Sequence, residues 1–196
     1  MQPSLGPPVL TVVFNQTSLN PDFEQQKLVE ACKRGDRSAQ HRLYHQYSKA
    51  MYNTCLRMLK VDADAEDALQ NAFIDVFTKL DSFRYESTIG AWIKRIVVNT
   101  CINHLKKRRL LTSEWDESIP EPPDVTTDTS EQDYQVARIK KALHDLPDGY
   151  RVVFSLYLLE GYDHAEIGQI LNISEATSKS QFSRAKQRIR EMLEEG

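Results

Sequence analysis

The chain has 196 residues, of which 40% are hydrophobic, so it can build packed helical cores; no apolar run approaches the ~20 residues that a membrane span requires. Its net charge of −3 is unevenly divided: residues 22–111 hold 16 Lys and Arg against 11 acids, residues 112–133 hold eight acids and no base, and residues 134–196 hold nine of each. Two regions with basic patches on either side of an acidic segment are compatible with DNA binding, so the overall charge does not exclude it.

The first part of the chain divides into a tail and a helical domain. Residues 1–21 carry no charge and include Pro3, Pro7 and Pro8, so we expect a disordered N-terminal tail. Residues 22–111 contain no proline and only two glycines, and their apolar residues recur at a spacing of three and four. This pattern predicts an all-α domain, with a first helix over residues 24–34 that ends at Gly35.

Three further helices are expected in this domain. Asp36 is placed to cap the second, whose buried face is Ala39, Leu43, Tyr47, Met51, Cys55 and Leu59. The third opens at residues 62–64 and turns inward Ala65, Leu69, Ala72, Phe73, Val76 and Leu80. A loop over residues 81–87 leads to Thr88, the expected cap of a fourth helix that runs to the basic cluster Lys106–Arg109.

Two of these helices carry polar faces of functional interest. The outer side of the third helix holds Asp64, Asp67, Gln70, Asn71 and Asp75. Acids near its start are favoured by the helix dipole, but the whole face also suits a basic partner. The fourth helix has a stripe at a spacing of three and four: Trp92, Arg95, Asn99, Asn103 and Lys106. Aromatic, Arg and Asn side chains stack on and bind single-stranded bases, although Trp92 is equally well explained as a core residue.

Residues 112–133 predict a flexible acidic linker. The segment has three prolines, no glycine, eight acids and few apolar residues, so it cannot bury enough apolar surface to fold as a domain. It separates the helical domain at 22–111 from a second helical domain at 134–196.

The end of the second domain predicts a helix-turn-helix. Asp163, with Glu166 three residues later, forms a capping box for a short helix; residues 172–174 make a turn, and Ser174 caps the next helix. That last helix buries Phe182, Ala185, Ile189 and Leu193 on one side and has no acid from Ala176 to Arg190. Its outer face and flanks carry small and basic residues, which are Ala176, Thr177, Lys179, Ser180, Ser183, Arg184, Lys186 and Gln187. Such a face fits the major groove of DNA, although many basic helical faces are simply solvated.

The order of these pieces resembles the extracytoplasmic-function (ECF) group of bacterial sigma factors in the sigma-70 family. The resemblance covers residues 24–194 and is carried by the phrases LVEACKRGD with RLYHQY, DAEDALQNAFIDVF, AWIKRIVVNTCINHLKKRR, LPDGYRVVFSLYLLEGYDHAEIGQILNIS and EATSKSQFSRAKQRIR. It implies an initiation factor with no catalytic activity and no cofactor, which gives core RNA polymerase its promoter specificity. Family members are often held by an anti-sigma factor, but others answer to different regulatory proteins.

The resemblance also implies residue roles in the first domain. Asp64, Asp67, Gln70, Asn71 and Asp75 would face the clamp helices of the largest polymerase subunit, with Asn71 in place of the family's usual acid. The loop from Phe83 to Thr88, including Arg84, would form the pocket for a flipped base of the −10 element. Trp92 and Arg95 would stabilise the melted junction, and Asn99, Asn103 and Lys106 would contact bases or phosphates.

In the second domain the resemblance implies a reader of the −35 element, built as four helices, with helices over residues 134–146 and 148–159 supporting the helix-turn-helix. Lys179, Ser180, Ser183 and Arg184 fall where the family reads bases, and Thr177 and Lys186 fall near phosphates. Two departures, Ala176 for a frequent glycine and Ser178 for a branched apolar residue, are expected to shift the promoter preference. The acidic linker resembles the segment that enters the RNA channel of polymerase.

Two other classes of protein compete with this interpretation. A stand-alone helix-turn-helix regulator accounts for residues 134–196 but leaves the first domain and the linker unexplained. For an enzyme, His41 and His45 are spaced i, i+4 as metal ligands can be, but Arg42 replaces the glutamate of a zinc hydrolase, so we expect no metal site. Three scattered cysteines without a CxxC pair are expected to be buried apolar residues, and no signal peptide is recognised, so a cytoplasmic protein without membrane insertion is expected.

Overall fold

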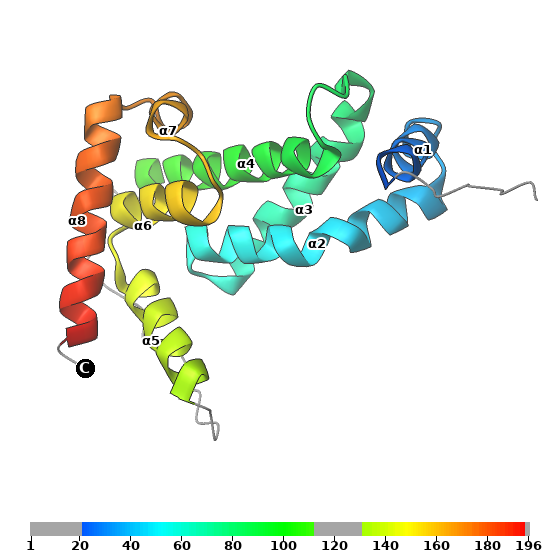
Figure 1. The fold of residues 1–196 in the computed structure, drawn as a ribbon. Coiled ribbons are helices and arrows are strands. Elements are labelled where there is room, and N and C mark those ends of the chain that lie inside the picture. Colours follow the sequence, from blue (N-terminus) through cyan, green and yellow to red (C-terminus); the bar gives the residue numbers. More distant parts are fainter. Residues whose placement is uncertain (1–20, 112–130, 195–196) are drawn as a thin grey trace, which may run out of the picture.

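The computed structural model describes residues 21–111 and 131–194, so most of the predicted tail and of the predicted linker lie outside the described residues, while Pro21, the last residue of the predicted tail, begins a helix. Every regular element in these two ranges is helical, which confirms the all-α prediction (Figure 1). The elements are α1 (Pro21–Lys33), α2 (Arg37–Leu59), α3 (Asp62–Lys79), the short η1 (Leu80–Ser82), α4 (Ile89–Leu111), α5 (Glu131–Asp145), α6 (Asp148–Phe154), η2 (Ser155–Leu159), α7 (His164–Leu171) and α8 (Glu175–Glu194). None of these helices combines the length and the apolar character needed to cross a membrane.

The helix boundaries of the first domain follow the predicted signals. Gly35 ends α1 with a φ of +81°, a conformation in which a side chain would be strained. The Asp36 carboxylate then accepts hydrogen bonds from the backbone amides of Ser38 (2.8 Å) and Ala39 (3.2 Å), and so caps α2. The Thr88 hydroxyl accepts from the Ala91 amide (3.2 Å) at the start of α4. Local capping chemistry therefore fixes where these helices start.

The core of the first domain lies between α2, α3 and α4, with α1 across the far end of α2 (Figure 1). The predicted inward faces of α2 and α3 are buried, except that Tyr47 is half-buried. Each fully buried Leu in such a core contributes about 1.5–3 kcal/mol relative to an exposed one. Cys32, Cys55 and Cys101 are free and buried, which confirms that they act as small apolar residues.

The second domain holds the predicted helix-turn-helix with two corrections before it. Helix α5 starts at Glu131, so the last three residues of the predicted linker are helical. The helix predicted over residues 148–159 is also not uniform: α6 gives way at Ser155 to a wider π turn, η2. The helix-turn-helix is confirmed, because Asp163 and Glu166 form the reciprocal capping box (2.7 and 2.8 Å) and Asn172 turns the chain in the left-handed region (φ 56°).

The two domains pack against each other, which the sequence did not predict. Helix α6 contacts α2, and α6 and α7 lie beside α4, while α5 and α8 extend away at the end opposite α1 (Figure 1). Buried side chains of the second domain join the core of the first without a break; they are Val152, Val153, Leu156, Ile167 and Phe182. The described chain is thus one packed body.

Candidate nucleic-acid interface

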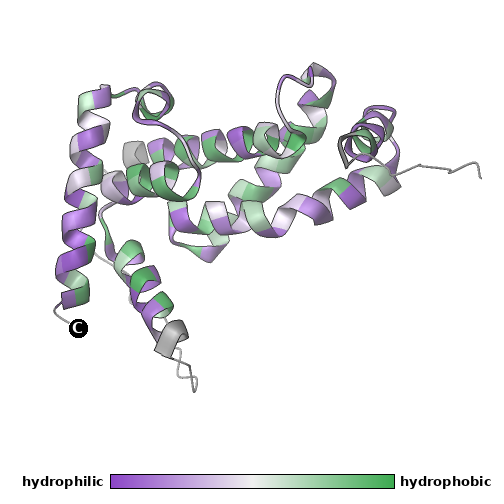
Figure 2. Cartoon of the chain, viewed as in Figure 1, coloured by the Kyte–Doolittle hydropathy of each residue, from purple (hydrophilic) through white to green (hydrophobic). Residues whose placement is uncertain are grey.

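The outer face of α8 is exposed and basic, as predicted. Lys179, Ser180, Ser183, Arg184 and Lys186 are all exposed, while Thr177 is half-buried. Most of the helix is hydrophilic, with hydrophobic residues only at intervals (Figure 2). One lysine of the face is not free, because the Glu175 carboxylate lies 2.7 Å from Lys179 Nζ; this hydrogen bond and its charge raise the pKa of Lys179. The face therefore presents a net positive, largely small-residue surface of the kind that a DNA groove accepts.

The face of α8 opposite its basic face packs against the rest of the second domain. Phe182, Ala185 and Ile189 are buried, and the Phe182 ring packs on Phe154 of α6 with their centroids 5.8 Å apart. At its start, the Ser174 hydroxyl accepts a hydrogen bond from the Thr177 amide (3.0 Å), which confirms the predicted cap. A groove-reading helix must be positioned rigidly for its contacts to discriminate between bases, and these contacts supply that support.

Ser178 is a supporting residue and not a base contact. Its side chain is fully buried, and its hydroxyl lies 2.9 Å from Nδ1 of His164 at the start of α7. The His164 ring in turn stacks on Tyr157, with centroids 4.3 Å apart. Any effect of Ser178 on promoter preference must therefore act through the position of α8, whereas Ala176, the other departure from the family pattern, is exposed on the outer face.

The polar stripe of α4 is also exposed. Arg95, Asn99, Asn103 and Lys106 face solvent, as does Arg84 in the preceding loop. Three of them, Asn99, Asn103 and Lys106, line one shallow hollow of about 330 Å³. Lys79 of α3 lines the hollow as well, and so does Ile170 of α7. The structure therefore brings these three predicted residues together, but with a helix of the second domain at the rim.

The aromatic residues beside this stripe are partly structural. The Phe83 side chain is buried, with its ring 4.8 Å from Tyr85 and 5.5 Å from Trp92, centroid to centroid. Phe83 thus packs beneath the loop in the free protein, and its place in the pocket for a flipped base stays a prediction. Trp92 is half-buried, so one part of its ring packs on Phe83 while another remains accessible.

The polar face of α3 forms a second exposed surface. Asp67, Gln70 and Asn71 are exposed, whereas Asp75 pairs with Lys79 (2.8 Å). Asp64 is half-buried and lies 3.4 Å from His104 and 3.6 Å from Arg108 of α4. Only part of the predicted face is therefore available to a partner in this conformation.

Sequence reasoning missed Ile74 on this same face. Its relative exposure is 63%, the largest among the exposed large hydrophobic residues, and it lies one helical turn beyond Gln70 and Asn71. The sequence feature that could have revealed Ile74 is its position outside the inward apolar stripe of α3. Single exposed apolar residues are common on protein surfaces, so Ile74 is of interest only because it lies on the predicted partner face.

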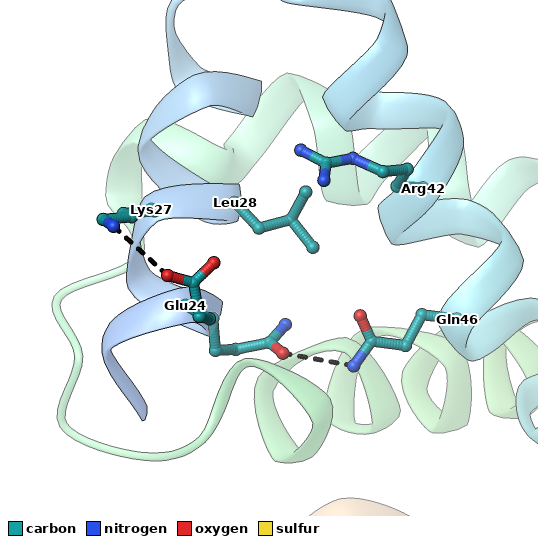
Figure 3. A pocket seen from close by; sticks show the side chains of 6 residues that line it. Glu24, Lys27, Leu28, Arg42 and Gln46 are labelled. Carbon is teal, nitrogen blue, oxygen red and sulfur yellow. Dashed lines mark hydrogen bonds and ion pairs between the residues drawn. The ribbon is translucent and has the colours of Figure 1, made fainter. Parts of the chain in front are cut away.

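Other features of the described residues carry less chemistry. A polar hollow of about 340 Å³ lies between α1 and α2, where Leu28 is flanked by Lys27, Arg42 and Gln46 (Figure 3). His41 and His45 lie with their Nε2 atoms 2.9 Å apart. Within residues 21–111 and 131–194, no three potential metal ligands come together.

Comparisons with known proteins assign both domains. The family model for sigma-70 region 2 matches residues 43–110, and the model for sigma-70 region 4 matches residues 137–189. The chain is 29% identical over 168 residues to the ECF RNA polymerase sigma factor SigM of Mycobacterium tuberculosis (strain H37Rv), covering 85% of this chain and 83% of the relative. It is 29% identical to the ECF sigma factor SigW of Bacillus subtilis (strain 168), covering 85% and 95%. The chain belongs to the sigma-70 family, in its ECF group.

The two sigma-70 regions map directly onto the two domains. Region 2 spans most of α2, all of α3 and most of α4, and region 4 runs from α5 into α8. A solved structure of the sigma factor RpoE with the anti-sigma factor NepR from Bartonella quintana matches 88% of this chain and 97% of that chain, at 24% identity and a TM-score of 0.57. This likeness confirms the fold.

Proposed function

We propose that this ECF sigma factor binds core RNA polymerase in the cytoplasm and directs promoter recognition, strand opening and transcription initiation at a specific set of promoters, without a catalytic step or cofactor of its own. The observation that carries the proposal is the presence of regions 2 and 4 in order on one chain. Each region presents an exposed polar face: the stripe of α4 in one and the basic face of α8 in the other.

Region 4 is proposed to read the −35 element with α8 in the major groove. Arg and Lys donate hydrogen bonds to guanine edges, and small residues allow the helix to approach the bases closely. Exposed Arg184 is the strongest candidate for a base contact, with Lys179, Ser180 and Ser183 beside it. Thr177 and Lys186 are proposed to contact phosphates, which position a reader but carry no sequence information.

Region 2 is proposed to bind the −10 element along α4. Arg84, Arg95, Asn99, Asn103 and Lys106 are exposed on this side, and Trp92 has an accessible part. Capture of an unstacked base needs a stacking surface and hydrogen-bonding groups that offset the lost pairing. The α4 stripe supplies both, with Phe83 buried beneath it.

The outer face of α3 is proposed to dock on the clamp helices of the largest polymerase subunit through Asp64, Asp67, Gln70, Asn71 and Asp75, with Ile74 as an apolar contact among them. We also propose an anti-sigma factor as a regulatory partner. Support for this comes from the structural neighbours, since the RpoE structure contains the anti-sigma factor NepR and that of CnrH contains the cytosolic domain of CnrY.

Arg184→Ala is expected to lower promoter discrimination by about 1–3 kcal/mol if the guanidinium reads a base edge. The measurement is a competition binding assay in which the holoenzyme chooses between the cognate promoter and a set of single-base variants of its −35 element. Arg190→Ala, an exposed arginine on another side of α8, serves as the matched control and should leave the ratio unchanged. If Arg184→Ala weakens binding equally to every variant, the residue contacts phosphate and does not read sequence.

The proposed function is tested by run-off transcription. The full chain is combined with purified core polymerase and promoter fragments from its source genome. We expect specific transcripts that appear only when both components are present. A stand-alone helix-turn-helix regulator would instead bind duplex DNA tightly and specifically without polymerase and would give no run-off product with core alone. Tight, specific DNA binding without polymerase, or the absence of a run-off product with core polymerase, would contradict the proposed function.

A further inference from the structure

The loop over residues 83–88, which joins η1 to α4, lies against α1 (Figure 1). The Tyr85 hydroxyl donates a hydrogen bond to the Glu30 carboxylate, 55 positions earlier in the chain. Lys33, three residues after Glu30, donates from its Nζ to the backbone carbonyl of Phe83 (3.3 Å). Two residues of α1 thus hold two residues of the loop that is expected to receive a flipped base of the −10 element.

The Lys33 ammonium lies at the centre of these contacts. Its Nζ is 3.3 Å from Oε1 of Glu30 and 4.8 Å from the centre of the Tyr85 ring, and the Lys33 side chain is only 17% exposed. Charge pairs and cation–ring contacts are stronger when they are partly removed from water. The ammonium therefore ties the Glu30 carboxylate, the Tyr85 ring and the loop backbone together.

The hydrogen bond between Tyr85 and Glu30 joins a neutral donor to a charged acceptor. Burial and this hydrogen bond raise the pKa of Tyr85 to about 12. The same hydrogen bond is the main cause that lowers the pKa of Glu30, and Lys33 adds to it. At neutral pH the hydroxyl is therefore protonated and the carboxylate is ionised, which makes this a charge-assisted hydrogen bond.

Tyr85 has a backbone conformation that its own sequence does not favour. Its φ is +60°, in the left-handed region, which residues other than glycine rarely occupy because Cβ crowds the backbone there. Such conformations persist only where surrounding contacts determine them, and they are concentrated at functional sites. The contacts from α1 to the Tyr85 hydroxyl and ring provide that determination.

The position of Tyr85 affects the side of region 2 that is proposed to bind the −10 element. Its ring packs on Phe83, and Phe83 packs on Trp92 of α4, with the centroids 4.8 and 5.5 Å apart. Arg84, between Phe83 and Tyr85 in sequence, is exposed. A shift of Tyr85 would therefore move Arg84 and the support beneath Trp92. Binding groups must be held within about 0.5 Å of their productive positions to be effective.

We propose that Glu30 and Lys33 of α1 are positioning residues for base capture, because they hold Tyr85 in its left-handed conformation and so preform the loop that receives an unstacked base of the −10 element. This role rests on the proposed function of region 2. A preformed loop avoids the entropy cost of ordering the loop when DNA binds. Both residues precede residue 43, where the match to the sigma-70 region 2 model begins, so they extend the −10 reader beyond the matched residues.

Limited proteolysis of the free full-length chain tests whether α1 holds the loop. Trypsin cleaves after Lys and Arg, and residues 1–20 and 112–130 contain neither, so trypsin has no cleavage site in those segments. Exposed Arg84 is the reporting site inside the loop. Glu30→Ala, Lys33→Met and Tyr85→Phe are each expected to speed cleavage after Arg84 by about fivefold, because the loop opens more often when a hydrogen bond is missing. Mass spectrometry of the fragments measures the rate.

Two substitutions on the same helix are the matched controls. Glu24→Ala and Lys27→Met break the exposed Glu24–Lys27 pair of α1 (3.2 Å) and should leave cleavage in the loop unchanged. Because Glu30 and Tyr85 share one hydrogen bond, the double variant Glu30→Ala/Tyr85→Phe should be cleaved no faster than the faster single variant. Unchanged cleavage in Glu30→Ala, equally fast cleavage in the controls, or effects that multiply in the double variant would overturn the attachment of the loop to α1.

Binding of the holoenzyme to forked promoter DNA tests what the attachment is for. The promoter is one identified by run-off transcription, and an abasic site replaces each single-stranded base of its −10 element in turn. The wild type should lose affinity most at the captured base. Glu30→Ala should reduce this preference for the intact base about fivefold, with unchanged affinity for the abasic fragment and for core polymerase. Equal weakening on intact and abasic DNA would indicate a general defect and would overturn the positioning role.

Tyr85→Ala and Tyr85→Gly test the role of the left-handed backbone. Both substitutions remove the ring and the hydroxyl, but glycine adopts a φ of +60° without the strain that alanine has there. Tyr85→Gly should therefore keep more of the preference for the intact base than Tyr85→Ala. An alanine variant that performs as well as the glycine variant would overturn the proposal.

The proposal and the proposed function can fail separately. A wild-type holoenzyme that gives specific run-off transcripts but does not distinguish an intact base from an abasic site would overturn base capture, and with it the positioning role of α1. The sigma-factor assignment would still stand in that case. An absence of run-off transcripts would contradict the proposed function itself, and the base capture that Glu30 and Lys33 are proposed to support would fall with it.

Discussion

Arg151→Met is expected to lower the free energy of unfolding by about 2–4 kcal/mol, because a buried group left without its hydrogen-bond partner costs about 1–3 kcal/mol. The loss arises because the carbonyls of Arg57, Met58 and Leu146 lose their donor and the Asp148 carboxylate loses a guanidinium 2.7 Å away. Methionine keeps the apolar stem but supplies no hydrogen bonds. Urea denaturation followed by circular dichroism gives the change directly.

The matched control for this prediction is Arg188→Met on α8. The Arg188 side chain is 65% exposed, and its ion pair with Glu191 is long at 4.0 Å, so its replacement should change the unfolding free energy by no more than about 0.5 kcal/mol. Hydrogen exchange should place the damage of Arg151→Met in region 4 and at the end of α2. An Arg151→Met protein as stable as the control would mean that the buried guanidinium contributes nothing net.

Ile74→Asp is expected to weaken binding to core polymerase by about 2 kcal/mol, or about thirtyfold, which is the size of a hot-spot effect at the centre of an interface. Ile74 is 63% exposed in the free protein, so the change should leave the fold intact. The proposed clamp-binding side chains of α3 surround it, and a buried carboxylate at this point would lack a partner. Fluorescence anisotropy with labelled sigma factor and increasing core polymerase measures the affinity.

Phe23→Asp provides the control for Ile74, because Phe23 is a similarly exposed apolar residue (52%) on a different helix, α1. This variant should bind core polymerase as the wild type does. Equal weakening by both substitutions would show a general effect of lost surface hydrophobicity. If both variants bind core polymerase with wild-type affinity, the part of α3 around Ile74 does not belong to the interface.

The parts of the fold that local chemistry decides could be predicted from the sequence. Asp36, Thr88 and Asp163 each cap the helix that they were expected to cap, because a short polar side chain before an apolar period satisfies amides close by in sequence. The helix-turn-helix was recognised for the same reason, through its capping box and the period of Phe182, Ala185 and Ile189. The exposed basic face of α8 followed directly from that period.

The parts that depend on distant contacts could not be predicted in this way. Arg151 bonds to carbonyls 93 and 94 positions earlier, and Glu160 to a side chain 103 positions earlier, and no periodicity encodes such pairs. The burial of Phe83 was not predicted because a loop residue gives no periodic signal of burial, whereas the structure packs it under Trp92. Ile74 was overlooked because the inward stripe of α3 was complete without it.

Direct titration of the full chain with purified core RNA polymerase tests the sigma-factor assignment most directly. We predict a saturable one-to-one complex that an unrelated sigma factor of the same bacterium displaces by competition, since both must occupy the clamp. The complex should recognise promoter DNA that neither component binds specifically alone. A chain that forms no complex with core polymerase at micromolar concentration, or one that binds without being displaced by the competing sigma factor, would contradict the account.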